Sequence, residues 1–240
     1  RLMSELNLSL DWETKSFFIN HSDLLPSVAS ERIKYEILRL VKGQWADHVI
    51  PIVHEIGLLN AWCEKNNVIK NDSFYLRDAK NFNSNELAIA LPLNRLVHLL
   101  SDKGLSNLCF SKQEIKTCQI LRKWQKKNDG VAFQTLNEAE RYALHIELEN
   151  HLPALILNLP PDYQNIWLER WRDPFDPLFH PSSPLGGFDL KELLGGVPDG
   201  PILGEIIEHL SKEKAFNRLH TRDEAVELAR YLWQQKQPLL

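Results

Sequence analysis

The sequence predicts an all-α protein, because apolar residues recur at helical spacing, helix-capping signals are frequent and strand patterns are nearly absent. Along most of the chain, apolar residues are three and four positions apart, whereas alternating runs bounded by turn residues are scarce. Residues 30–41 illustrate the pattern, and Gly43 can end that helix. We expect its apolar face to be buried. The residues of this face are Ile33, Ile37, Leu40 and Val41.

Three helix starts show the capping-box spacing, in which a hydroxyl oxygen accepts an amide hydrogen bond and a Glu three residues later reaches back. The pairs are Ser111 with Glu114, Thr135 with Glu138, and Thr221 with Glu224. An apolar stripe follows the last pair, and we expect it to pack against a neighbouring helix. Its residues are Ala225, Leu228, Ala229 and Leu232.

The composition is that of a globular protein and limits its possible partners. With 240 residues, 43% hydrophobic and 25% charged, the chain is not disordered throughout. Its formal net charge of -4 excludes a generally basic protein, so any nucleic-acid binding has to be local. No apolar run approaches the roughly 18 residues that span a bilayer. The three cysteines lack CxxC spacing, which favours a reducing compartment, and we expect a cytoplasmic protein without a membrane partner.

Two changes in composition divide the chain. Residues 66–85 are rich in Asn and predict a loop, and residues 159–187 contain prolines at a density that we expect to prevent a regular helix. The predicted organisation is three helical lobes in an elongated arrangement, with a proline-rich connector and no sizeable β-sheet. The segments are 1–70, 84–160, 161–184 for the connector, and 185–240.

Known catalytic motifs are absent from the sequence. It contains no GxxxxGK[ST], GxGxxG, HExxH or GxSxG element, and its nine histidines are scattered singly. Glu147 and Glu149 would point to different faces of a helix, and Asp173 and Asp176 lie among turn-forming prolines. We therefore predict no catalytic residue, metal ligand or cofactor in this chain.

Lysines gather on one side of the helix predicted over residues 111–127. At 100° per residue they fall within a stripe about 100° wide, opposite Leu121 and Trp124. Two interpretations stay open: a track for phosphates, whose binding would weaken with salt, or a plain solvated helix face. The residues are Lys112, Lys116, Lys123, Lys126 and Lys127.

A second candidate site is the helix start at residues 200–204. Pro201 suits the first helical position, and the unpaired amides there can bind an anion. Gly200 would let another backbone come close, and Gly204 has no side chain to block a ligand. The alternative is a tight turn with close helix packing.

The chain contains, in this order, distinctive stretches at residues 1–14, 30–37, 171–178, 187–190, 200–204 and 221–225. Together they resemble class II tRNA nucleotidyltransferases and bacterial poly(A) polymerases, especially the cyanobacterial form. Residues 1–14 are similar to the family's junction segment, with Leu2 where an aromatic residue is usual. Residues 30–37 contain the Glu-Arg-Ile-x-x-Glu signature of the neck, followed by Gly57-Leu58-Leu59.

The resemblance continues into the last third of the chain. Residues 171–178 are similar to the family's connector, and three further elements are similar to its tail: residues 187–190, 200–204 and 221–225. In the last of these, Asp223 replaces Glu.

The resemblance implies a protein of head, neck, body and tail, in which the head binds magnesium and uses ATP or CTP. The head's motifs are missing, so we expect the head to precede Arg1 and this chain to be inactive alone. Glu31, Arg32 and Glu36 would support the head's nucleotide pocket and otherwise form intrahelical pairs. Gly200 and Gly204 would grip the tRNA away from its 3′ end, and the lysine stripe would lie on the body, where the acceptor arm passes.

The expected partner is therefore tRNA or another structured RNA. Whether the parent protein adds CC, A, CCA or poly(A) stays open, as does its oligomeric state. A different class of hypothesis is an all-helical protein-interaction module with no RNA role. An independent enzyme that uses the scattered carboxylates is the least favoured alternative.

Overall fold

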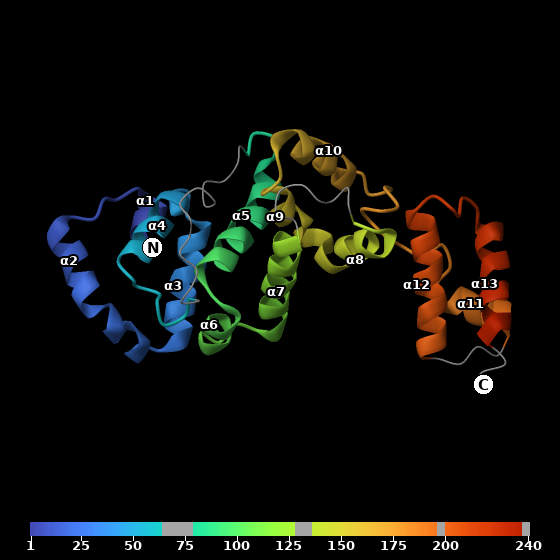
Figure 1. The fold of residues 1–240 in the computed structure, drawn as a ribbon, viewed down its shortest axis with the longest axis horizontal. Coiled ribbons are helices and arrows are strands. Elements are labelled where there is room, and N and C mark those ends of the chain that lie inside the picture. The colour runs from blue at the N-terminus through green and yellow to red at the C-terminus, as the bar shows by residue number, and fades with distance from the viewer. Residues whose placement is uncertain (64–78, 128–135, 196–199, 237–240) are drawn as a thin grey trace. The chain divides into compact units, whose positions relative to one another are not determined.

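The computed structural model describes residues 1–63, 79–127, 136–195 and 200–236. Every regular element within these ranges is a helix, which confirms the all-α prediction (Figure 1). The elements are α1 (Leu2–Leu6), α2 (Trp12–His21), η1 (Ser22–Ser27), α3 (Ser30–Lys42), α4 (Ala46–Glu55), α5 (Ser84–Leu99), α6 (Asp102–Asn107), α7 (Lys112–Lys127), α8 (Glu138–Leu148), η3 (Glu149–His151), α9 (Leu152–Ile156), α10 (Pro161–Arg172), α11 (Gly187–Leu194), α12 (Pro201–Ala215) and α13 (Arg222–Lys236).

The chain forms two compact units. The first unit comprises Arg1–Ala132 with Asn150–Leu168, and the second comprises Phe133–Glu149 with Glu169–Leu240. This grouping places α8 in the second unit, although residues 84–160 were predicted as one segment. The division into three lobes stays a prediction. Most of the predicted loop at residues 66–85 lies outside the described residues.

In the first unit, α5 is the central helix and packs against α3, α7 and α9. The apolar face predicted for residues 30–41 is buried, and its residues Ile33, Ile37, Leu40 and Val41 are each at most 7% exposed. Helix α1 lies across α3 and α4. The unit therefore buries the apolar stripes of its helices against one another, as the helical periodicity predicts.

A buried arginine ties α5 to the junction of α3 and α4. The Arg95 side chain is 5% exposed, and its Nε and Nη2 donate to Asp47 at 2.7 and 2.5 Å. Its Nη1 donates to the carbonyl oxygens of Val41 at 2.7 Å and Gly43 at 3.2 Å. A planar guanidinium can satisfy all these acceptors at once, so this interaction fixes three helices relative to each other.

A close contact fixes the start of α6. The backbone amide and hydroxyl of Ser101 both donate to the carbonyl oxygen of Trp62 at 2.9 Å, and the same hydroxyl caps α6 by accepting the Gly104 amide. A Cβ atom on Gly104 would lie less than 3.0 Å from that carbonyl oxygen. Only glycine fits at position 104.

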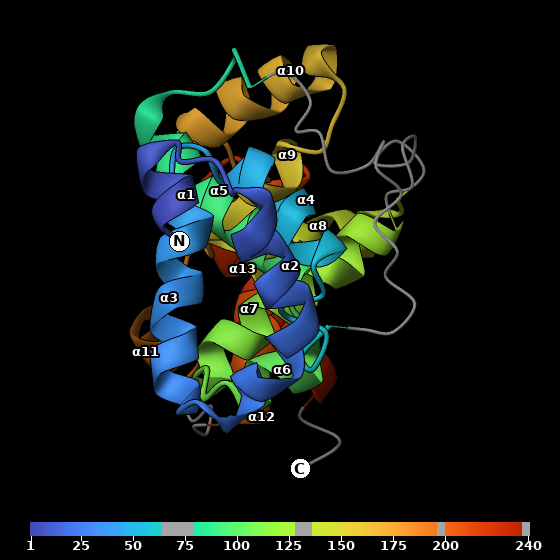
Figure 2. The ribbon, with the colours of Figure 1, turned by 90° about the vertical axis from the view of Figure 1, so that its left-hand side faces the viewer.

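Helix α2 and the 3₁₀ turn η1 form an arm of the first unit, and α2 lies at its edge in Figure 1 and in front of the other helices in Figure 2. Asp11 caps α2 by accepting the Thr14 amide at 2.9 Å, yet neither α2 nor η1 contains a buried residue. Trp12 is 78% exposed. The arm therefore depends on local hydrogen bonds more than on a core.

The second unit has its own core, which α11, α12 and α13 enclose. On α13 the predicted stripe is confirmed in part. Ala225 and Ala229 are buried, whereas Leu228 and Leu232 are partly buried, and Trp233 takes the inner position one turn later. Helix α8 also belongs to this unit, and Arg218 donates two hydrogen bonds to Glu138 on this helix, both at 3.0 Å.

A regular helix forms inside the proline-rich segment, so the prediction that residues 159–187 lack one was wrong. Helix α10 begins at Pro161 and continues to Arg172. Proline is tolerated at the first position of a helix because its missing amide would have no partner there, and residues 162–172 contain no further proline. The irregular part begins only at Asp173.

Two of the three capping boxes are confirmed. The Ser111 amide donates to Glu114 at 2.6 Å and the Glu114 amide to the Ser111 hydroxyl at 3.2 Å. Thr221 and Glu224 form the same pair of reciprocal hydrogen bonds. Thr135 lies outside the described residues, and the box that starts α8 is formed by Asn137 and Glu140 instead. An asparagine side chain caps a helix as well as a threonine does, so the spacing of Thr135 and Glu138 did not locate the start of α8.

Candidate nucleic-acid interface

The five lysines predicted to share a face of α7 are all exposed. These residues are Lys112, Lys116, Lys123, Lys126 and Lys127. On the opposite side, Cys118, Leu121 and Trp124 are buried. The sequence therefore located the lysine face correctly, and its role in binding stays a prediction.

The buried side of α7 is held firmly, which fixes the position of the lysine face. Arg122 is mostly buried, and its guanidinium pairs with Asp102 and donates to the carbonyl oxygens of Val97 and Leu100. At the helix start, Lys34 pairs with Glu114 at 2.9 Å. Burial raises the pKa of Glu114, but the hydrogen bond from the Ser111 amide and the ion pair with Lys34 outweigh this and lower it.

The lysines of this face differ in their surroundings. The ammonium groups of Lys123 and Lys127 lie 4.7 and 5.5 Å from the centroid of the Trp124 ring. Within the described residues, Lys112, Lys116 and Lys126 take part in no ion pair. These three charges are not offset by a carboxylate and are available to an anionic partner.

The predicted neck residues do not form intrahelical pairs, which corrects the expectation for Glu36. Arg1 on the N-terminal side of α1 bonds Glu36, and it also bonds Glu5 at 2.7 Å. Glu5 in turn accepts from Arg39 at 2.8 Å. This network connects α1 to α3, a long-range pairing that helical spacing within α3 could not reveal.

Arg32 and Glu36 line a cavity of about 440 Å³ in the first unit. Apolar side chains from η1, α3 and α4, including Leu25, Ile37 and Val53, form most of the remaining wall. Glu31 is exposed and is not among the lining residues. The structure therefore brings two of the three predicted neck residues to one cavity, and their role in supporting a nucleotide pocket stays a prediction.

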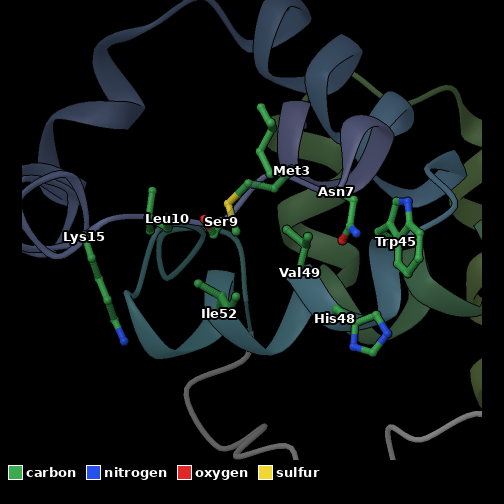
Figure 3. Close-up of a pocket in the computed structure, with 10 residues that line it drawn as sticks. Met3, Asn7, Ser9, Leu10, Lys15, Trp45, His48, Val49 and Ile52 are labelled. Carbon is green, nitrogen blue, oxygen red and sulfur yellow. The ribbon is translucent and has the colours of Figure 1, made fainter.

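A second cavity, of about 280 Å³, lies between α1, the start of α2 and α4. Figure 3 shows Asn7, Trp45 and His48 on one side of it and Lys15 on the other. The Lys15 ammonium bonds Glu55 at 2.6 Å, so its charge is already paired. The wall therefore combines apolar side chains such as Val49 and Ile52 with the polar side chains of Asn7, Ser9 and His48.

In the second unit, Gly200 and Pro201 start α12 as predicted, with Pro201 at the first helical position. Among the described residues, no atom lies within 4 Å of where a Cβ on Gly200 would be, and the predicted close approach of another backbone stays a prediction. The Gly200 φ of 132° is the reason for glycine there, since other residues rarely adopt this angle. A Cβ on Gly204 would likewise meet no atom of the described residues within 4 Å.

Two phenylalanines of the second unit were not singled out from the sequence as binding residues, yet the structure exposes them. Phe175 is 87% exposed and Phe188 is 82% exposed. Each is followed by an aspartate whose carboxylate bonds backbone amides and an arginine. The sequence signal was a Phe-Asp pair beside proline or glycine, which we interpreted only as part of a family resemblance.

The described residues contain no group of three or more His, Cys, Asp or Glu side chains that could hold a metal ion. The carboxylates of Asp173 and Asp176 instead accept backbone amides of their own turn. Among the described residues, no helix is both long and apolar enough to cross a membrane.

Comparison of the sequence with known proteins gives a weak match to a curated enzyme. The chain is 25% identical over 226 residues to the CCA-adding enzyme of Anoxybacillus flavithermus. The match covers 88% of this chain and 52% of that enzyme, so the chain spans about half the length of this relative. No family model matches the chain. The similarity supports a distant relation to tRNA nucleotidyltransferases.

Proposed function

We propose that this chain is the RNA-binding portion of a tRNA nucleotidyltransferase or poly(A) polymerase, with the catalytic head in a preceding segment. The observation that carries the proposal is the similarity to a CCA-adding enzyme along 88% of the chain, because a shared local motif would cover far less. The partner would be tRNA or another structured RNA.

The lysine face of α7 supports this proposal. Helical RNA is recognised largely through its phosphates and groove shape, so a locally basic surface can suffice on an acidic protein. Lys112, Lys116 and Lys126 present charges without a carboxylate partner among the described residues, from a helix whose other side is rigidly held. No atom of the described residues lies within 4 Å of a Cβ placed on Gly200 or Gly204, which would allow a phosphate to approach the amides at the start of α12.

The first experiment measures tRNA binding by the full chain over a series of salt concentrations. The affinity should fall steeply as salt rises, because each bound phosphate releases counterions. Lys116→Ala should reduce the slope of log affinity against log salt by roughly 0.7 to 0.9. Lys42→Ala is the matched control, because it removes one equally exposed charge from the end of α3.

Equal slopes for the wild type and both variants would place any RNA contact away from α7. A chain that binds no RNA would favour the alternative, a helical protein-interaction module. In a second experiment, the chain is incubated with tRNA, ATP, CTP and magnesium. We expect no nucleotide incorporation, and incorporation would contradict the proposal that the chemistry lies in another segment.

A further inference from the structure

Phe175 and Phe188 are exposed by the same arrangement of neighbouring side chains. In each case the aspartate that follows the phenylalanine fixes the local backbone, and an arginine fixes that aspartate. Asp176 accepts the amides of Leu178 at 3.0 Å and Phe179 at 2.9 Å, and Asp189 accepts the amide of Gly186 at 2.9 Å. We call these two segments, residues 173–180 and 186–189, the phenylalanine turns.

The first phenylalanine turn is the more extensively fixed. Arg170 donates to both oxygens of Asp176, at 2.7 and 3.1 Å, and its guanidinium lies 4.5 Å from the centroid of the Phe179 ring. The Phe175 amide donates to Asp173 at 2.9 Å. Pro174 and Pro177 restrict the backbone on either side. The fixed backbone of this turn therefore holds the Phe175 ring in an exposed position.

The contrast with Phe179 shows this directly. Phe179 lies four residues further on, is 3% exposed and packs 4.2 Å from the His145 ring. The same turn thus buries one phenylalanine and leaves the other 87% exposed. An apolar ring that remains almost wholly in water on a fixed backbone forgoes the stabilisation of burial.

The second phenylalanine turn repeats the arrangement at the start of α11. Asp189 accepts from Arg222 at 2.8 Å as well as from the Gly186 amide. These bonds hold the pKa of Asp189 below its usual value, with the Gly186 amide as the main cause. Because Arg170 and Arg222 offset the adjacent carboxylates, neither turn presents an unpaired negative charge from Asp176 or Asp189 to an RNA phosphate.

We infer that Phe175 and Phe188 are stacking platforms for unpaired bases of the bound RNA. A single ring with both faces free suits a base, because stacking needs only the face of one aromatic side chain. A protein partner would instead require a wider apolar surface around the anchor residue. Around Phe175 the exposed neighbours are Arg172, Asp173 and Pro174, two of them charged. The inference rests on the proposed function, and it assigns the recognition of unpaired bases to the second unit.

The experiment compares two RNA probes with equal numbers of phosphates: a hairpin with unpaired loop bases and a fully paired duplex. The full wild-type chain should bind the hairpin more tightly. Phe175→Ala and Phe188→Ala should each weaken hairpin binding by roughly 5-fold to 100-fold, and duplex binding should not change. The salt slope should be unaltered, because no charge is removed. Equal melting temperatures of variants and wild type serve as the folding control.

Substitutions by Leu and Tyr distinguish stacking from a plain apolar contact. Tyr at either position should retain hairpin binding, whereas Leu should weaken it as Ala does. Full binding by the Leu variants would overturn the inference in favour of an apolar anchor. Unchanged hairpin binding by the Ala variants would also overturn it, while leaving the proposed function intact. A wild-type chain that binds neither probe would overturn both.

Discussion

The lysine face of α7 and the phenylalanine turns expose functional side chains by different physical means. On α7, a regular helix buries Trp124 and Leu121 on one side, and its periodicity places the lysines on the other. Phe175 lies on irregular backbone and Phe188 in the first turn of α11, and at both places aspartate and arginine side chains fix the backbone that exposes the ring. The first surface would act through charge and the second through stacking, so salt should weaken binding to the first far more than to the second.

The largest expected effect is the loss of folding stability when the buried ring behind each surface is replaced by alanine. Trp124 is 1% exposed and supports the lysine face, and Phe179 is 3% exposed and supports the first phenylalanine turn. Trp124→Ala and Phe179→Ala should each lower the free energy of unfolding by about 3 to 5 kcal/mol, because each leaves a large cavity. Urea unfolding measures this. A loss below about 1 kcal/mol in either variant would mean that the ring behind that surface does not hold it.

An effect of intermediate size is expected in the pH dependence of folding stability, and it should arise beside the first phenylalanine turn, not at the lysine face. Burial, and then the charge of Arg170, lower the pKa of His145 to about 3, and Asp176 and His180 also face it. The unfolded chain therefore binds one more proton than the folded chain between about pH 3 and pH 6.5. Stability should be full above pH 6.5 and fall on acidification, by about 2 kcal/mol at pH 5.

His145→Gln should remove this part of the pH dependence, which can be measured by urea unfolding at pH 7 and pH 5. Other histidines of the chain contribute equally to the wild type and the variant, so the difference between them isolates His145. An identical loss on acidification in both proteins would contradict the assignment.

A smaller effect is expected at the helix start that orients the lysine face. Ser111→Ala removes the hydroxyl that accepts the Glu114 amide, and should cost about 1 kcal/mol of unfolding free energy. Thr221→Ala makes the same change at α13 in the second unit and serves as its counterpart. Thermal unfolding of both variants should give similar shifts, whereas no shift at Ser111 would show that the cap does not stabilise α7.

The smallest effect is expected from the exposed side chains themselves. Lys116→Ala and Phe175→Ala should each change the free energy of unfolding by less than about 0.5 kcal/mol, because neither side chain is packed in a core. Parallel urea titrations would measure both. A larger loss for Phe175→Ala would mean that the ring contributes to the fold, and the argument for an outward-facing platform would weaken.

The features that the sequence predicted correctly are local ones. Helical spacing and capping-box spacing located the buried face of α3, the lysine face of α7 and the starts of α7 and α13. The features it did not predict join residues far apart in the chain. The bonds of Arg95 to Asp47 and of Arg1 to Glu36 span 48 and 35 positions, and no periodicity within one helix encodes them.

The proline-rich segment illustrates another limit of predicting structure from the sequence. A count of prolines predicted irregular structure over residues 159–187, but the position of each proline decides its effect. Pro161 begins α10, whereas Pro174 and Pro177 flank the exposed Phe175. The exposure of that ring could not be predicted, since a phenylalanine is ordinarily expected in the core.

The contact at Gly104 can help to identify homologous sequences. The approach of α6 to the Trp62 carbonyl leaves no room for even a methyl group, so natural variation at this position should be restricted to glycine wherever the two backbones keep this approach. At 25% identity most aligned positions are uninformative. A glycine three residues after a serine, at the start of a short helix, is a steric marker that could separate true homologues from chance alignments.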